Sequence, residues 1–143
     1  MENLNFIGLE KEKSEKLANM LNDLLANYQV FYMNVRGFHW NIKGDKFFEL
    51  HEKFEELYDD LIIKIDEIAE RVTTLNATPM HSFQDYLGTS EIKPVKDADD
   101  PQTTVQSILD SFRILLVKER EILDLSDEMG YEGTNALAIY YIR

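Results

Sequence analysis

Residues 47–74 carry an apolar repeat that constrains the fold more than any other feature of the chain. Its members are Phe54, Leu57, Leu61, Ile65, Ile68 and Val72, spaced by 3, 4, 4, 3 and 4 residues. These steps place the side chains on one face of an α-helix, because a helix has about 3.6 residues per turn. We therefore predict a long amphipathic helix over residues 47–74, with this face buried.

A second segment with the same periodicity precedes it. We predict a helix over about residues 10–36, with Gly37 as its C-terminal cap. A short connection through Gly44 and Asp45 separates the two helices. Long helices joined by a short loop pack antiparallel, so these two should form one half of a helical bundle.

The periodicity stops between residues 75 and 102. This stretch contains Pro79, Gly88, Pro94 and Pro101. So long a connection is unusual in a compact domain, but a bundle can use it as a crossover that runs the length of the molecule. Within the crossover, Phe83, Tyr86 and Leu87 predict a short helical turn that covers the core.

Periodicity returns in a third helix, from residue 103 or 104 to residue 129, ended by Gly130 and Gly133. Thr134 is expected to cap a fourth helix, which the end of the sequence at Arg143 leaves short. We expect either a truncated fourth helix or a neighbouring subunit that covers the exposed faces. The predicted fold is thus an all-α four-helix bundle, with residues 1–143 as a single domain.

Composition narrows the possible partners and compartments. The net charge of −12 argues against wrapping DNA by charge alone, because phosphate binding needs clustered lysine and arginine. No apolar run of membrane-spanning length is present, and the N-terminus does not resemble a secretory signal. The chain has no cysteine, which fits a reducing compartment. The cytoplasm is therefore the expected location, with no membrane partner.

Four potential metal ligands lie on one flank of the predicted 47–74 helix. His51 and Glu55 are four residues apart, as are Asp66 and Glu70, so each pair shares one helical face. At about 100° per residue, all four fall beside the apolar stripe. Neutral imidazole and carboxylate are ligands expected of iron, manganese or zinc. This helix is therefore predicted to bind metal.

The two pairs cannot hold the same ion within one helix. His51 and Asp66 are 15 residues apart in the sequence, or roughly 22 Å along the axis at a rise of about 1.5 Å per residue. A two-fold axis near residues 60–61 would bring the first pair of one subunit against the second pair of another. An apolar patch on the same side suits such an interface; it consists of Tyr58, Ile62 and Ile63.

Each pair alone also has a simpler explanation. A histidine and a glutamate one turn apart usually make a solvated contact worth a few tenths of a kcal/mol. Lys64 or Arg71 could neutralise the two acids of the second pair. Just after a predicted helix cap, His39 is more often a packed loop residue, and Trp40 is expected in the core. The joint occurrence of these residues, in order and on one flank, favours the metal site.

Two motifs identify a family. Residues 39–44 read HWNIKG, followed by Leu50-His51 and Glu55, and residues 65–71 read IDEIAER. Together with the long crossover, they resemble the Dps family of ferritin-like mini-ferritins. The resemblance implies a twelve-subunit homo-oligomeric shell, built from two-fold dimers, that oxidises Fe(II), preferably with hydrogen peroxide, and stores ferric mineral against oxidative stress.

The same resemblance assigns roles to residues. The implied intersubunit ferroxidase site consists of His39, His51 and Glu55 of one subunit and Asp66 and Glu70 of its dimer mate. Trp40 matches the tryptophan beside that site. Glu52 and Glu56 match positions associated with mineral nucleation on the inner wall.

The chain departs from the family pattern in two places that matter for function. Position 55 is commonly aspartate in the family and is glutamate here, so this ligand is longer by one methylene. The lysine-rich N-terminal tail of DNA-binding members is absent, and residues 1–16 mix both charges. The alternative function is that of a DNA-compacting nucleoid protein with the same fold, against which the missing tail argues. A third possibility is a helical bundle whose metal site has decayed.

Overall fold

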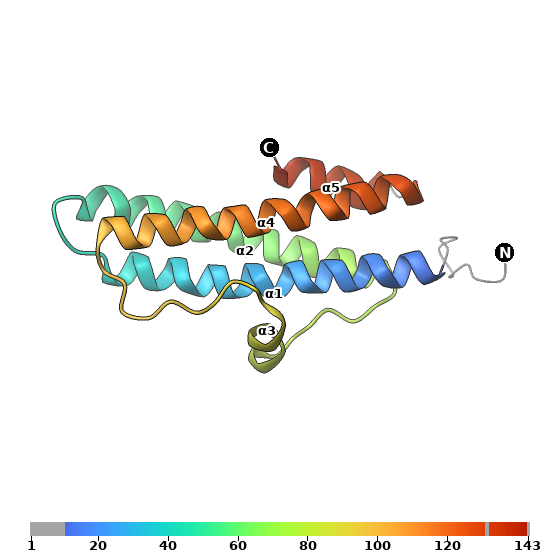
Figure 1. Cartoon of the computed structure of the whole chain (residues 1–143), viewed down its shortest axis with the longest axis horizontal. Coiled ribbons are helices and arrows are strands. Elements are labelled where there is room, and N and C mark those ends of the chain that lie inside the picture. The colour runs from blue at the N-terminus through green and yellow to red at the C-terminus, as the bar shows by residue number, and fades with distance from the viewer. Residues whose placement is uncertain (1–10, 131, 143) are drawn as a thin grey trace.

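Helices make up the regular structure of residues 11–130 and 132–142, the part of the chain described by the computed structural model. They are α1 (Lys11–Asn41), α2 (Phe47–Thr74), α3 (Phe83–Thr89), α4 (Pro101–Met129) and α5 (Glu132–Ile142). The three long helices α1, α2 and α4 lie side by side, and α5 folds back along the C-terminal half of α4 (Figure 1). The all-α prediction is confirmed for these residues.

The bounds predicted for α2 are confirmed, but those of α1 are wrong. α1 continues through Gly37 and ends at Asn41, so His39 and Trp40 lie on its last turn rather than in a loop. The apolar spacing explains the difference, because Phe38 and Ile42 extend the buried stripe and are each 2% exposed. Gly37 does not adopt the left-handed conformation typical of a cap.

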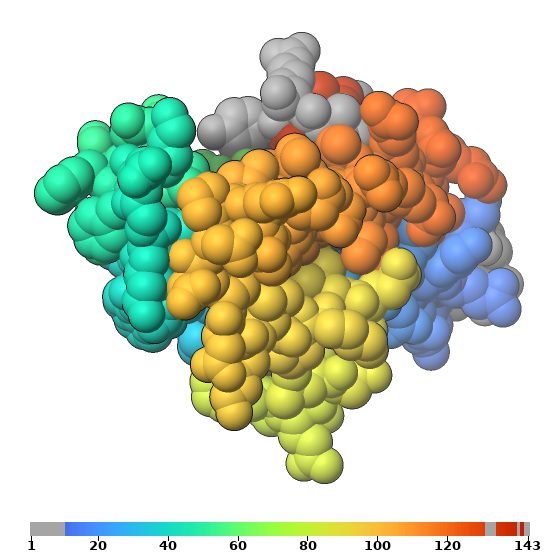
Figure 2. Space-filling model, turned by 60° about the vertical axis from the view of Figure 1, so that its left-hand side comes forward, coloured from blue at the N-terminus to red at the C-terminus, as the bar shows by residue number. Residues whose placement is uncertain are grey.

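Asparagine side chains of α1 hold the crossover against the bundle. The Asn27 side chain is fully buried, and its Oδ1 accepts hydrogen bonds from the backbone N–H groups of Glu91 and Ile92, both at 3.0 Å. The Asn34 Oδ1 accepts one from the Val95 N–H at 2.8 Å. These bonds satisfy backbone donors of an irregular segment that lies against α4 at the surface (Figure 2).

The short helix α3 forms where it was predicted, yet it does not cover the core. Phe83 is 75% exposed and Leu87 is 52% exposed. Tyr86 is half-buried, and its hydroxyl donates to the Met80 carbonyl oxygen at 2.7 Å. The expectation that all three would pack inward is therefore wrong, because α3 has no buried residue.

α4 begins earlier than predicted and ends at the predicted glycine. Asp100 caps its first turn, accepting a hydrogen bond from the Thr103 N–H at 2.8 Å, and Pro101 occupies the first helical position. Gly130 ends α4 with a left-handed φ of 71°. α5 already begins at Glu132, so Thr134 lies inside its first turn and is buried rather than capping it.

The core runs between α1 and the helices packed around it. Its fully or almost fully buried members include Leu17, Leu21, Leu25, Phe31, Val35, Leu61, Ile68, Val72 and Ile122. Within the described residues, no helix combines the length and apolar character needed to cross a membrane.

Candidate metal centre

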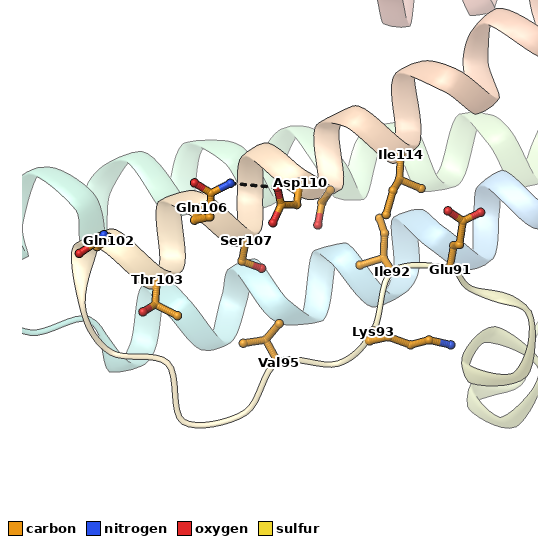
Figure 3. A pocket seen from close by; sticks show the side chains of 11 residues that line it. Glu91, Ile92, Lys93, Val95, Gln102, Thr103, Gln106, Ser107, Asp110 and Ile114 are labelled. Atoms are coloured by element: carbon orange, nitrogen blue, oxygen red, sulfur yellow. Dashed lines mark hydrogen bonds between the residues drawn. The ribbon is translucent and has the colours of Figure 1, made fainter.

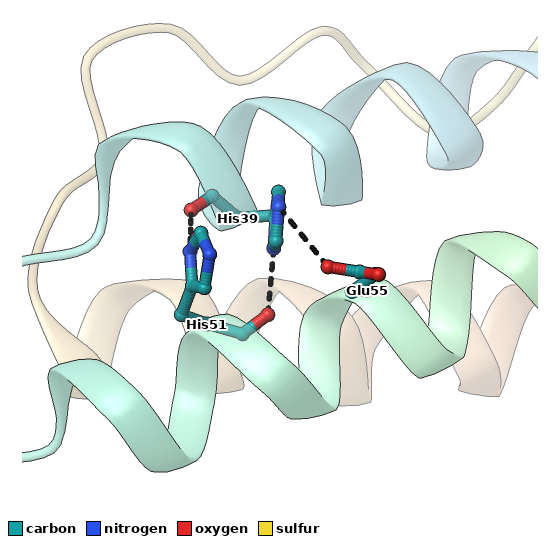
Figure 4. Close-up of side chains that lie close together, drawn as sticks. All are labelled: His39, His51 and Glu55. Atoms are coloured by element: carbon teal, nitrogen blue, oxygen red, sulfur yellow. Dashed lines mark hydrogen bonds and ion pairs between the residues drawn. The ribbon is translucent and has the colours of Figure 1, made fainter.

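Two histidines meet where the end of α1 packs against the start of α2. The His39 and His51 rings are stacked, with centroids 3.7 Å apart and planes inclined by 18°. The His39 Nδ1 lies 2.6 Å from the His51 carbonyl oxygen, and the His51 Nδ1 lies 2.8 Å from the His39 carbonyl oxygen (Figure 4). Each ring is thus fixed to the backbone of the other helix.

These contacts determine which ring nitrogens can bind a metal. A carbonyl oxygen can only accept, so both Nδ1 atoms must be the donors. In the neutral imidazole the proton therefore sits on Nδ1, and the lone pair of Nε2 stays available. Histidines that ligate metals commonly have their other ring nitrogen held in this way. The histidine pair is consequently oriented as two Nε2 ligands.

Glu55 completes a group of three. Its Oε1 lies 3.6 Å from the His39 Nε2, and one potential ligand atom from each residue lies within 4.8 Å of the others. Two ligands on one ion with bonds of about 2.1 Å are separated by roughly 3–3.5 Å. A small side-chain adjustment would therefore let the three converge on one ion. Among the residues that the structure describes, this is the one such group of histidines and acids.

Two half-buried aromatic rings contact the histidine rings. The Tyr58 ring meets the His39 ring edge-on at 5.3 Å, and the Phe47 ring stacks on the His51 ring at 5.0 Å. His39 is 6% exposed, whereas Glu55 belongs to the exposed surface of α2. The group is thus held firmly from within the molecule and remains open towards its surface.

Trp40 does not lie in the core, and that prediction was wrong. Its side chain is 58% exposed, and its ring packs against the Arg36 guanidinium, whose central carbon lies 4.7 Å from the ring centroid. At the end of α1 it follows the buried His39 by one residue, which turns it towards the surface. Trp40 therefore neighbours the metal-ligand group without joining it.

Asp66 and Glu70 lie on the surface of α2, apart from the histidines. The pKa of Glu70 is raised above its ordinary value, first because Glu70 shares a hydrogen bond with Asp66 and then because the Asp66 charge repels its own. Lys64, expected as a neutralising partner, is instead paired with Asp60 at 2.9 Å. The structure therefore contains a three-residue group near the start of α2 and a separate pair of acids further along the same helix.

The two other predicted acids point away from this group. Glu52 and Glu56 are both exposed on α2, and Glu56 forms an ion pair with Lys53 at 3.2 Å. They do not belong to the group of potential ligands.

Sequence reasoning missed a buried acid in the centre of the bundle. Glu119 of α4 is 2% exposed and accepts a hydrogen bond from the Tyr28 hydroxyl. Burial raises the pKa of Glu119, opposed by that bond and by the charge of Lys64. The sequence did indicate that this acid is buried, because Glu119 lies at helical spacing between Leu115 and Ile122 on the apolar stripe of α4.

A groove lies between the crossover and α4, lined by polar and apolar side chains (Figure 3). Its volume is about 560 Å³, and Gln106 donates to Asp110 across one turn of α4 at its wall, at 2.9 Å. None of the residues lining it is a predicted site residue.

Comparisons with known proteins place the chain in a family. Residues 18–143 match the family model of the ferritin-like domain. The chain is 40% identical over 139 residues to the DNA protection during starvation protein of Porphyromonas gingivalis, covering 97% of this chain and 87% of that protein. It is also 47% identical over 137 residues to an uncharacterized protein of Haemophilus influenzae, covering 96% of this chain and 86% of the relative.

Solved structures give the same assignment. A crystal structure of a Dps protein from Vibrio cholerae, described as a member of a broad superfamily of ferritin-like diiron-carboxylate proteins, superposes with a TM-score of 0.96 at 58% identity, covering 99% of this chain and 89% of that one. A Dps protein from Bacillus brevis superposes with a TM-score of 0.89 at 31% identity, covering 94% and 90%. The predicted ferritin-like fold is confirmed, and the chain belongs to the Dps family of ferritin-like proteins.

Proposed function

We propose that this chain oxidises Fe(II) at dinuclear sites shared between two subunits and stores the ferric product. The observation that carries this proposal is the separation of its ligands. His39, His51 and Glu55 converge. Along α2, Asp66 lies roughly 16 Å from Glu55 and roughly 22 Å from His51 at about 1.5 Å per residue, and Glu70 lies one turn further on. Three ligands make an incomplete site for iron, which accepts further carboxylates readily.

A two-fold axis beside residues 60 and 61 completes both sites at once. It sets residue 51 of one α2 opposite residue 70 of the other, and residue 55 opposite residue 66. The interface is isologous, so each dimer has two equivalent sites. Exposed apolar side chains support it, since Ile62 is 43% exposed and Ile63 is 60% exposed on the helix that would form the contact.

Two Fe(II) ions held together match the electron demand of hydrogen peroxide, the oxidant that we expect to be preferred. Each ion gives up one electron, the O–O bond is cleaved, and two hydroxide ions form. Because the two electrons arrive together, no hydroxyl radical is released. The chain contributes neutral Nε2 ligands, fixed by the Nδ1 contacts, and carboxylates whose charge stabilises the ferric state.

Storage requires an enclosed interior. We propose that six such dimers form a twelve-subunit shell in the cytoplasm, where it would protect against oxidative stress. Glu52 and Glu56 would face the interior and begin mineral deposition, and Trp40 would lie beside the ferroxidase site. The net charge of −12 is consistent with attraction of cations to such a particle.

The proposal is tested by removing one ligand while keeping a donor to the His39 carbonyl oxygen. In His51→Asn the amide can still donate to the His39 carbonyl oxygen, but nothing replaces Nε2. Anaerobic Fe(II) oxidation by peroxide should consume two Fe(II) per peroxide in the parent protein, and should slow by at least about tenfold in the variant. His81→Ala is the matched control, because this exposed histidine lies outside the metal-ligand group and its ring pairs with the Pro79 carbonyl oxygen. An unchanged rate in His51→Asn would overturn the assignment.

Compaction of DNA is the second candidate, favoured by one observation, the name of the Porphyromonas gingivalis relative. Charge argues against it. Residues 1–10 of the N-terminal segment, on which part of that argument rests, lie outside the described residues. A gel-shift assay at low salt, with and without divalent cations, separates the two functions, since binding through phosphates weakens steeply as salt rises.

A further inference from the structure

Arg36 is held among aromatic rings on the outer side of α1. Its guanidinium carbon lies 4.7 Å from the centroid of the Trp40 ring, 5.4 Å from that of Tyr32 and 6.0 Å from that of Tyr58. Tyr32 and Trp40 are one helical turn before and after Arg36, so both stack along the same face of α1. A flexible side chain is thereby restricted to one region.

The N–H groups of this guanidinium have no acceptor in the part of the chain that the structure describes. Several lysines of the described residues do form ion pairs, among them Lys43, Lys64 and Lys118. Rings that cover the faces of a guanidinium leave its in-plane donors uncovered, and this planar fork matches a carboxylate. Arg36 is therefore ready to receive an anionic group from outside the chain.

The same contacts locate Arg36 beside the metal-ligand group. The Tyr58 ring lies near the guanidinium and also meets the His39 ring edge-on at 5.3 Å, and His39 in turn pairs with Glu55. Arg36 thus lies level with residues 55–58 of α2. Under the two-fold axis described above, the residue opposite position 55 in a second copy is Asp66.

We propose that Arg36 binds the Asp66–Glu70 carboxylate pair of a second copy of this chain, at the rim of the shared metal site. This inference rests on the dimer of the proposed function. Within one chain the two exposed carboxylates lie one helical turn apart on α2, where like charges repel each other. A cation supplied by the partner therefore lowers their electrostatic energy. This ion pair between subunits stabilises the dimer before any metal binds.

If this ion pair forms, the stability of the metal-free dimer should depend on Arg36. In the presence of a chelator, Arg36→Gln should raise the dimer dissociation constant by about tenfold for each of two symmetric contacts, and so by about a hundredfold overall. Analytical ultracentrifugation at several salt concentrations measures this constant. Higher salt should reduce the difference in dissociation constant between the parent and Arg36→Gln. Arg36→Lys keeps the charge without the planar guanidinium. Its dimer dissociation constant should lie between those of the parent and of Arg36→Gln.

Two further variants make the result specific. Arg113→Gln removes the same charge from the exposed surface of α4, where Arg113 is only loosely paired with Asp110 at 3.9 Å, and should leave the constant unchanged. In an Asp66→Asn background, Arg36→Gln should weaken the dimer less than it does in the parent, because one of the two carboxylates that Arg36 binds is already neutral. Circular dichroism establishes that each variant keeps its helical content.

The outcomes separate this inference from the proposed function. If Arg36→Gln weakens the dimer equally with and without Asp66→Asn, or does not weaken it, Arg36 does not bind these acids, although shared sites can still form. If the parent chain stays monomeric at all concentrations and oxidises no iron, both proposals fail together.

Discussion

Sharing of each site between two subunits can be tested by complementation between two inactive variants. His51→Asn removes a ligand from the three-residue group, and Asp66→Asn removes one from the acidic pair. In a dimer of either variant alone, both sites lack a ligand. In a mixed dimer the two losses fall on the same site, so the other site receives an intact group from one subunit and an intact pair from the other.

The expected recovery follows from counting. When both variants are co-expressed in equal amounts and pair at random, half of the dimers are mixed, and each mixed dimer has one intact site. About one quarter of all sites should therefore be intact, given two equivalent sites per dimer. If each site lay within a single chain, every site would still lack a ligand, and recovery would be close to none.

The assay is the initial rate of peroxide-driven Fe(II) oxidation, together with the number of Fe(II) ions bound tightly under anaerobic conditions. Both should reach about a quarter of the parent values. His51→Asn co-expressed with Glu55→Gln is the matched control, because both changes affect the same three-residue group, so no mixed dimer has an intact site. Recovery in this control, or none in the test pair, would refute the shared-site geometry.

Three further predictions concern single residues. Asn27→Leu should lower the free energy of unfolding by about 1–3 kcal/mol or more in urea titrations, because it leaves the buried Ile92 N–H without its acceptor, together with the half-buried Glu91 N–H. Asn22→Ala, at a more exposed site, should cost much less, and equal losses would contradict the role of burial. Glu119→Gln should gain stability relative to the parent as pH rises above 4.5, the ordinary glutamate pKa, because the folded protein holds the proton of Glu119 more tightly than the unfolded chain; a stability difference independent of pH would contradict this. Glu55→Asp should require more Fe(II) for half-maximal oxidation, since the shorter side chain draws the carboxylate away from the His39 Nε2, now 3.6 Å from it; unchanged Fe(II) dependence would show that this ligand is not length-sensitive.

Apolar periodicity was sufficient to predict the long helices. α2 has the predicted bounds and contains the whole stripe from Phe54 to Val72. The bounds of α1 failed only because Gly37 was given more weight than the continuing apolar positions 38 and 42. The crossover was harder to predict. The amide groups of Asn27 and Asn34 hold it as well as the buried Ile92. Hydrophobic patterning therefore placed α3 correctly but wrongly turned Phe83 inward.

For the candidate site, the spacing of residues along one helix was a better predictor than composition. The i, i+4 pairs predicted which side chains share a flank, and the length of α2 predicted that one chain cannot unite them. The arrangement of the rings was beyond such reasoning, because the contacts of His39 and His51 with each other's backbone depend on how closely α1 and α2 pack. Trp40 was misplaced for the same reason, since its exposure follows from the orientation of the last turn of α1.

Locating bound iron in crystals tests the central claim most directly. Crystals grown with Fe(II) under anaerobic conditions, and measured on both sides of the iron absorption edge, should show anomalous density between two subunits. We predict ions held by His39, His51 and Glu55 of one subunit together with Asp66 and Glu70 of the other. Density confined to one subunit, or dimers in which the acidic pair faces away from the histidines, would contradict the account.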